Sequence, residues 1–179
     1  VWSQKEFTAR SQIFTNTKSN SSIKILGLIK NKREYNYIKS EYLINDSSST
    51  DIKKYKVILP AANGSGVLGE IISTPLIGKP GMGHTMSFRS IGKFDTEVEA
   101  ENVLKYIKSK FARVMIGVKK TTQHMNPGVF EYLPNQDFTN KSDIDWSKPI
   151  SEIDKQLYKK YGLEKKEIDF IETHVKAMS

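Results

Sequence analysis

The chain has 179 residues, 28 Lys and Arg against 20 Asp and Glu, and no cysteine. That length can bury a core without covalent staples, and the lack of cysteine excludes disulfides and cysteine-ligated zinc or iron–sulfur sites. The net charge of +8 favours an anionic partner, nucleic acid before an acidic membrane surface, and no apolar run approaches the roughly 20 residues that a membrane helix needs.

The chain begins with a polar segment, residues 1–22, in which Asn16–Ser22 (NTKSNSS) has the composition of a loop. Residues 1–10 contain no apolar stretch after a basic start, so we expect no secretory signal, a cytoplasmic location and no membrane partner. Because the chain opens with Val rather than Met, we interpret it as part of a longer protein.

Strand patterns follow this segment. Ile23–Ile29 and Tyr35–Ile44 are rich in β-branched and aromatic residues, and the polar stretch Asn45–Asp51 after them predicts a loop. Tyr55–Pro60 predicts a short strand that ends at its proline. Thr85–Phe94 returns to a strand pattern, and together these segments predict a mostly antiparallel sheet.

A glycine-rich stretch, residues 61–84, separates the last two of these strands. It holds six of the chain's eleven glycines together with two prolines. This density predicts a long, shaped loop with a short strand at Gly69–Thr74. Long ordered loops in compact domains usually carry function.

The strongest helix signal starts at Thr96, which forms a capping-box pattern with Glu99. Apolar side chains then recur within one sector of about 120° of a helix, and basic side chains fall outside it. The pattern therefore predicts one long amphipathic helix with a buried stripe and a basic back. The apolar set is Val103, Leu104, Ile107, Phe111, Val114, Met115 and Val118, and the basic set is Lys105, Lys108, Lys110, Arg113, Lys119 and Lys120.

Two further helices are expected near the C-terminus. Ser147 is placed to cap the first, Pro149 to occupy its first turn and Gly162 to end it. The apolar faces are Ile150, Ile153, Leu157 and Tyr161 in the first helix, and Ile168, Ile171 and Val175 in the second. Such a helix pair can read a major groove, but the mixed charges of Glu164–Glu167 favour a packing role.

The predicted class is therefore α+β: a mostly antiparallel sheet with long glycine-rich loops, one long amphipathic helix, and a C-terminal helical pair. We divide the chain into a polar N-terminal segment (residues 1–22), a central domain (residues 23–138) and a helical tail (residues 139–179).

Base methylation is suggested by Asn126–Phe130 (NPGVF), which is close to the Asn-Pro-Pro-aromatic loop of amino-methylating DNA methyltransferases. In that loop the asparagine holds the target amino group and the aromatic ring stacks on a flipped base. Here glycine replaces one proline and a residue is inserted, and no glycine-turn unit for S-adenosylmethionine precedes the motif. We favour a turn that leads into a core strand, Val129–Leu133.

Metal-dependent cleavage of phosphodiesters is a second reaction for which the sequence contains residues similar to a known motif. Asp154 followed by Glu164–Lys166 resembles the acidic and Glu-x-Lys elements of nucleases, but both lie in expected helices. The three histidines, His84, His124 and His174, show no ligand spacing. We therefore predict neither catalytic nor metal-binding residues in this chain.

DNA contact is favoured over both chemistries. Lys and Arg neutralise phosphates, and Gln, Asn and Arg can pair with purine edges in the major groove. The loops Ala61–Ser87 and Lys119–Asn126 combine such residues with glycine, although any single lysine can equally be a solvated surface charge. The predicted DNA-binding residues are Asn63, Ser65, Lys79, His84, Thr85, Arg89, Lys119, Lys120, Gln123 and His124.

Three stretches of the chain resemble a known family. They read ANGSGVLGEIISTPLIGKPGMGHTMSF, SIGKFDTEVEAENVLKYIKSKFARVMIGVKKTTQ and VFEYLPNQDFTNKSDIDWSKPISEIDKQLYKKYGLEKKEIDFIE. In this order they resemble the C-terminal target recognition domain, of the TaqI-like specificity kind, of bacterial type II restriction–modification proteins. These are N6-adenine DNA methyltransferases and fused methylase–endonucleases. The likeness covers about residues 53–175, and its most specific parts are Glu99–Asn102, Lys110-Phe111 and Pro134–Phe138.

The resemblance implies sequence-specific recognition of double-stranded DNA. The methylase core with its cofactor motif is missing from the chain, and we expect it upstream in the same polypeptide. No cofactor is expected in this part, whereas the parent would use S-adenosylmethionine, and Mg²⁺ if it is a nuclease. Two alternatives stay open: a stand-alone enzyme that modifies or cleaves DNA, and a protein-interaction domain that docks through its helical tail.

Overall fold

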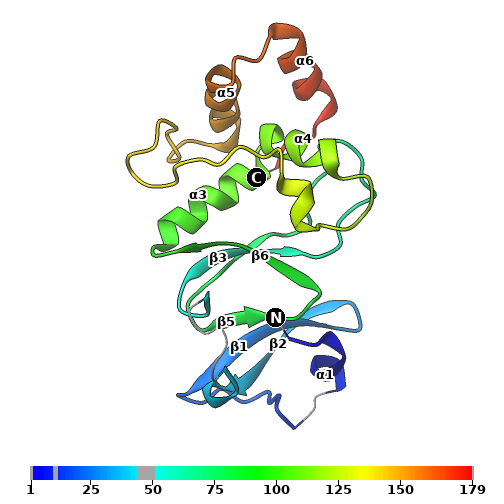
Figure 1. Ribbon diagram of the computed structural model, residues 1–179, viewed down its shortest axis with the longest axis vertical. Coiled ribbons are helices and arrows are strands. Elements are labelled where there is room, and N and C mark those ends of the chain that lie inside the picture. The colour runs from blue at the N-terminus through cyan, green and yellow to red at the C-terminus, as the bar shows by residue number, and fades with distance from the viewer. Residues whose placement is uncertain (1, 10–11, 44–50, 179) are drawn as a thin grey trace.

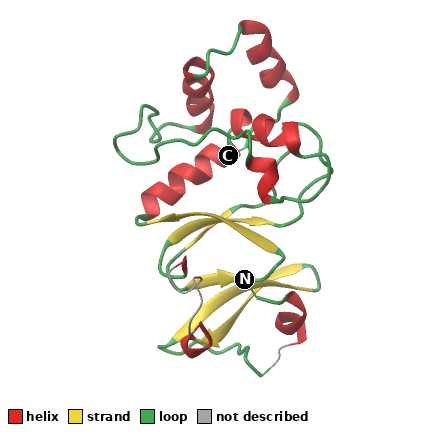
Figure 2. Ribbon diagram, viewed as in Figure 1, coloured by secondary structure: helices red, strands yellow, loops and turns green. Residues whose placement is uncertain are grey.

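The computed structural model describes residues 2–9, 12–43 and 51–178. Its strands are β1 (Ser22–Ile29), β2 (Lys32–Lys39), β3 (Tyr55–Pro60), β4 (Leu76–Gly78), β5 (Met82–His84) and β6 (Phe88–Phe94). Its α-helices are α1 (Gln4–Ala9), α3 (Glu97–Lys108), α4 (Lys110–Lys119), α5 (Ile150–Lys160) and α6 (Lys165–His174), with 3-10 turns η1 (Ser40–Leu43) and η2 (Pro127–Phe130). The predicted α+β class is confirmed, because helices and antiparallel-rich sheets occur together (Figure 2).

The strands form two three-stranded sheets rather than one. Their orders are β2-β1-β5 and β4-β3-β6. Every pairing is antiparallel except that of β1 with β5, which is parallel. Figure 1 shows the first sheet with α1 at one end of the molecule, the second sheet beside it, and the helices α3 to α6 beyond the second sheet.

Apolar clusters hold these layers together. Phe7 of α1 and Phe14 pack against Ile25 on the outer face of the first sheet. Leu26 of the first sheet and Ile58 of the second meet in the cluster between the two sheets. The opposite face of the second sheet packs on α3, α4 and η2 through Val57, Leu59, Val103, Ile107, Ile116 and Val129. The layers are thus continuous from α1 to the helices.

Two of the strands predicted from runs of β-branched and aromatic residues are confirmed. The predicted strand Ile23–Ile29 is β1, and Tyr55–Pro60 matches β3. The predicted strand Tyr35–Ile44 begins earlier, as β2, because Lys30 and Asn31 adopt positive φ values of 48° and 60° and close a two-residue hairpin turn. Its predicted end was wrong, because β2 stops at Lys39 and Ser40–Leu43 form η1. Ile44 and residues 45–50 of the predicted loop lie outside the described residues.

One strand expectation was wrong, and one helix was not predicted. The polar N-terminal segment has the expected loop before β1, and it also contains α1, whose Phe7 is fully buried. Gly69–Thr74 forms no strand, and the strands of this region are β4 and β5. The reason is a side chain: Asn63 Nδ2 donates to Ile71 O at 2.9 Å, and Asn63 Oδ1 accepts from Ser73 N at 2.6 Å. The backbone groups that a strand would use are therefore already bonded.

The predicted long helix is divided at Ser109 into α3 and α4. The capping box of Thr96 and Glu99 is confirmed. At the break, the Asp154 carboxylate accepts hydrogen bonds from Lys110 N at 3.1 Å and Phe111 N at 2.9 Å, so it caps α4 from α5. Burial raises the pKa of Asp154, against the effect of these two hydrogen bonds.

The basic back predicted for this helix is also wrong in part. Arg113 and Lys120 are buried, because the glycine-rich loop and the C-terminal segment cover this side of α4. Lys105 Nζ likewise donates to Trp146 O at 2.6 Å. The exposed basic surface of the helix is correspondingly smaller than its sequence pattern indicates.

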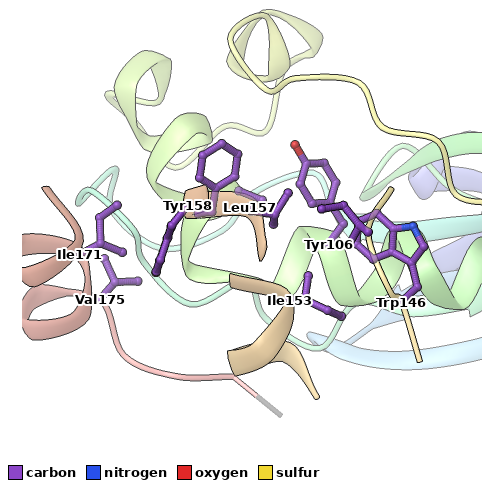
Figure 3. Packing of buried hydrophobic residues seen from close by; sticks show 10 residues of the cluster. Tyr106, Trp146, Ile153, Leu157, Tyr158, Ile171 and Val175 are labelled. Carbon is purple, nitrogen blue, oxygen red and sulfur yellow. The ribbon is translucent and has the colours of Figure 1, made fainter. Parts of the chain in front are cut away.

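The C-terminal helices α5 and α6 lie where they were predicted, and Gly162 between them has a φ of +64°. The predicted start of α5 was wrong, because Pro149 is its N-cap and the Ser147 hydroxyl donates to Asp145 instead of capping the helix. The predicted strand Val129–Leu133 is wrong, because Pro127–Phe130 forms η2 instead. Figure 3 shows Tyr106 of α3 and Trp146 beside Ile153 and Leu157 of α5, in the cluster that joins the tail to α3 and α4.

Among the described residues, none of the helices is long and apolar enough to cross a membrane.

Candidate nucleic-acid interface

The structure joins two loops that are far apart in the sequence. The loop after β3 and the segment after α4 share backbone hydrogen bonds from Asn63 N to Gln123 O at 2.7 Å and from Met125 N to Ala61 O at 2.9 Å. Their nearest exposed residues, 64–68 and 121–124, form one surface, which we call the paired-loop surface. Both loops belong to the regions predicted to contact DNA.

A buried ion pair supports this surface from below. Lys120 Nζ pairs with the Glu70 carboxylate and donates to Asn63 O at 2.7 Å, and the two side chains are only 2% and 15% exposed. The same carboxylate accepts from Ser65 N at 2.9 Å and Gly66 N at 3.2 Å. Burial raises the pKa of Glu70, but the hydrogen bonds from Lys120, Ser65 and Gly66 outweigh it, and the pKa lies below the ordinary value.

Gly66 sets how closely the two loops approach. Its φ is +95°, and a Cβ atom at this position would lie 2.7 Å from the carbonyl carbon of Thr121. Any larger residue would therefore push the second loop away, in addition to the strain of a left-handed backbone. The paired-loop surface needs glycine here for contact as well as for conformation.

Arg113 anchors the first loop at Gly69. Its guanidinium donates from Nη1 to Gly69 O at 2.7 Å and from Nη2 to Lys176 O at 2.5 Å. Burial lowers the pKa of Arg113. Sequence analysis missed both Arg113 and Glu70. A signal for Glu70 was present, because it is the single acidic residue between positions 61 and 94 and needs a cation once buried.

The paired-loop surface presents polar groups and two apolar side chains, Val67 and Leu68. Hydroxyl, amide and imidazole groups can donate to and accept from base edges. Val67, which is 64% exposed, can contact a thymine methyl group. The polar side chains are those of Ser65, Thr121, Thr122, Gln123 and His124. Thr121 and Thr122, like the apolar Val67 and Leu68, do not belong to the predicted DNA-binding residues.

Four of the ten predicted DNA-binding residues are buried, so their prediction as direct contacts is corrected. They are Asn63, His84, Thr85 and Lys120, with exposures of 4%, 7%, 0% and 3%. Thr85 Oγ1 donates to Gln4 Oε1 at 2.7 Å. His84 lies 2.9 Å from Thr85 O through Nδ1 and 2.6 Å from Ser90 Oγ through Nε2, and burial lowers its pKa to about 4. These buried side chains make hydrogen bonds within the chain that support the fold.

The remaining predicted cations lie at different places. Lys79 pairs with Glu97 at 2.8 Å, at the other end of β3 from the paired loops and about 17 Å away along that strand. Lys119 pairs with Glu131 at 2.9 Å beside the second loop. Arg89 lies opposite Leu59, near the base of the loops, and its buried Nε has no hydrogen-bond partner within the described chain.

The residues weighed for catalysis have structural roles or lie apart. Asn126 precedes η2, and its side chain makes no capping hydrogen bond. Asp154 caps α4, and Glu164 forms a capping box with Glu167 at the start of α6. In the part of the chain that the structure describes, no group of three or more His, Asp and Glu residues is placed to hold a metal ion.

In a comparison with known proteins, no protein-family model, no curated protein and no solved structure matches the chain.

Proposed function

We propose that this chain is a sequence-specific recognition domain for double-stranded DNA. The observation that carries the proposal is the joining of two distant loops into the paired-loop surface, which exposes hydrogen-bonding side chains on a backbone fixed by buried contacts. Fixed donors and acceptors suit the reading of base edges, because little conformational freedom is lost on binding. The excess of basic residues favours the same partner.

The resemblance to target recognition domains defines the larger role in this proposal. The chain would place the catalytic part of a cytoplasmic restriction–modification protein on its DNA site. Methylation with S-adenosylmethionine, or cleavage with Mg²⁺, would be carried out by that other part. The isolated chain should bind DNA weakly and with strong salt dependence, because much of the interface would belong to the catalytic part.

Selection from a pool of random-sequence duplexes tests the proposal. Repeated binding to the immobilised chain, with sequencing of the retained DNA, should enrich one short consensus. Single-stranded DNA of the same pool serves as the control and should enrich none. Retention of duplexes with no consensus would reduce the function to unspecific binding, and failure to retain any DNA would refute the proposal.

A second candidate function is the binding of a protein partner. An apolar groove of about 410 Å³ lies between α4 and α6 and is lined by Phe111, Val114, Met115, Leu163, Phe170 and Ile171. Phe170 is 46% exposed and extends this apolar surface towards solvent. In this reading, Phe170→Asp should abolish partner binding, whereas charge reversal at Lys79, Arg89 and Lys119 should leave it intact.

A further inference from the structure

The net charge of the chain is confined to one half of the molecule. Residues 1–94 contain 14 Lys and Arg against six Asp and Glu, whereas residues 95–179 contain 14 of each. The two sheets and α1 therefore carry the whole excess of +8, and the helical half is neutral. An anionic partner is attracted to the sheet end of the molecule, which contains residues outside the predicted DNA-binding set.

The β1–β2 hairpin is the basic element that projects at this end. Its pairing runs without a bulge from Ser22 opposite Lys39 to Ile29 opposite Lys32. The two-residue turn, Lys30 and Asn31, is exposed, as is Lys32 directly after it. Figure 1 shows the hairpin in the sheet farthest from α5 and α6. At this length each strand extends about 26 Å, which is enough to follow several phosphates of a duplex.

The charges of the hairpin are less compensated than those of the helices. Among the described residues, Lys24, Lys30 and Lys32 lie within ion-pair distance of no carboxylate, and the Lys24 ammonium instead lies 3.9 Å from the centre of the Tyr35 ring. On the helical half, most lysines pair with neighbouring acids, as in Lys155–Glu152, Lys160–Asp143, Lys165–Asp169 and Lys166–Glu164. Uncompensated cations on a rigid hairpin are available to phosphates.

Arg33 connects the hairpin to the first of the paired loops. Its Nη1 donates to Thr74 O at 2.5 Å and its Nη2 to Ser73 O at 3.2 Å. The guanidinium also lies 5.4 Å from the centre of the Phe88 ring. The glycine-rich loop is thus attached to α4 and the second loop near its start and to the hairpin near its end. A duplex on the paired-loop surface has the hairpin as its basic neighbour.

We propose that the β1–β2 hairpin binds the phosphate backbone of duplex DNA through Lys24, Lys30 and Lys32. In this assignment, which rests on the proposed function, the hairpin supplies sequence-independent affinity and the paired-loop surface supplies sequence preference. None of the three lysines belongs to the set predicted from the sequence, because their lack of a carboxylate partner becomes visible only in the fold.

The test is the salt dependence of duplex binding, measured by fluorescence anisotropy with the full chain and a labelled duplex of mixed sequence. The variant Lys30→Gln/Lys32→Gln removes two hairpin charges. The control Lys141→Gln/Lys159→Gln removes two exposed charges from the helical half. For the hairpin variant, the slope of log K against log[salt] should fall by about 2 and affinity at low salt by on the order of tenfold. The control variant should keep the slope and the low-salt affinity of the wild type.

The outcomes distinguish failure of the hairpin assignment from failure of the proposed function. A hairpin variant with the slope and affinity of the wild type overturns the hairpin assignment and leaves DNA binding in place. Equal losses in the hairpin variant and the control also overturn it, because total charge would then explain the effect. A wild-type chain that binds no duplex at low salt overturns the proposed function together with the assignment. Lys30→Arg/Lys32→Arg, which keeps the charges, should retain the wild-type slope, and circular dichroism confirms folding.

Discussion

At the scale of single residues, the side chains that shape the candidate interface are buried ones. Glu70, Lys120 and Asn63 bond the backbone of the glycine-rich loop from inside, and their neighbours Ser65 and Val67 stay exposed. The structure therefore separates residues that support the loop from residues that can contact DNA. The sequence pattern could not distinguish these two roles, because lysine and asparagine suit DNA contact and internal hydrogen bonding equally well. The distinction depends on burial, which distant residues of the chain create.

The Glu70–Lys120 pair should be important for stability. Glu70→Gln would leave the Lys120 ammonium buried without a counter-charge, and we expect a loss of about 3 kcal/mol in the free energy of unfolding, measured by urea denaturation. The matched control is Glu152→Gln, which removes an exposed partner of Lys155 and should change stability little. Similar midpoints for the two variants would contradict the structural role of the pair.

His84 should make stability depend on pH. In its neutral form Nδ1 donates to Thr85 O and Nε2 accepts from Ser90 Oγ. Protonation of Nε2 reverses the second bond and places a positive charge on a buried ring. Because burial lowers the pKa from 6.5 to about 4, the unfolded state binds more protons between these values, and stability falls as pH falls through this window.

The size of this effect can be measured. From pH 7 to pH 5 the His84 contribution should decrease by about 2 kcal/mol. His84→Gln, which does not titrate, should lose correspondingly less stability over the same interval in urea denaturation. Parallel pH profiles for the wild type and this variant would show that His84 is accessible to solvent or paired differently.

At the scale of elements, contacts between distant segments decide where a helix breaks and which segments form strands, when the local sequence pattern does not. Strand β1, strand β3 and the capping box at Thr96 were predictable because their signals lie within a few residues. The break at Ser109 was not, since the carboxylate that caps α4 comes from Asp154 on α5. The missing strand at Gly69–Thr74 has a similar cause, because the Asn63 side chain occupies its backbone groups.

The close approach of the two loops can be tested at Gly66. Gly66→Ala places a methyl group against the Thr121 backbone, whereas Gly81→Ala, also at a positive φ of 80°, meets nothing within 4 Å. Both variants carry the same kind of backbone strain, so their difference isolates the contact between the loops. We expect Gly66→Ala to lose about 1 kcal/mol or more beyond the control, and to shift the NMR amide signals of residues 121–124. Equal stability and unchanged signals would contradict the tight pairing of the loops.

At the scale of the whole molecule, charge and packing are separated along the chain. The sheet end carries the excess of basic residues, and the helical end is neutral and contains the largest buried cluster. The candidate interface lies between them, where loops from the second sheet meet the end of α4. The candidate site was therefore only partly predictable: the sequence indicated the two loops, but their pairing and the exposed Thr121, Thr122 and Val67 required the fold.

The central claim is that the chain distinguishes DNA sequences, and the most direct test compares two duplexes of equal length. One carries the consensus obtained by selection and the other a scrambled version, each titrated with the chain at the same salt concentration. The account predicts tighter binding of the consensus, on the order of a hundredfold or more. Equal affinity for the two duplexes, or no binding to either, would contradict it.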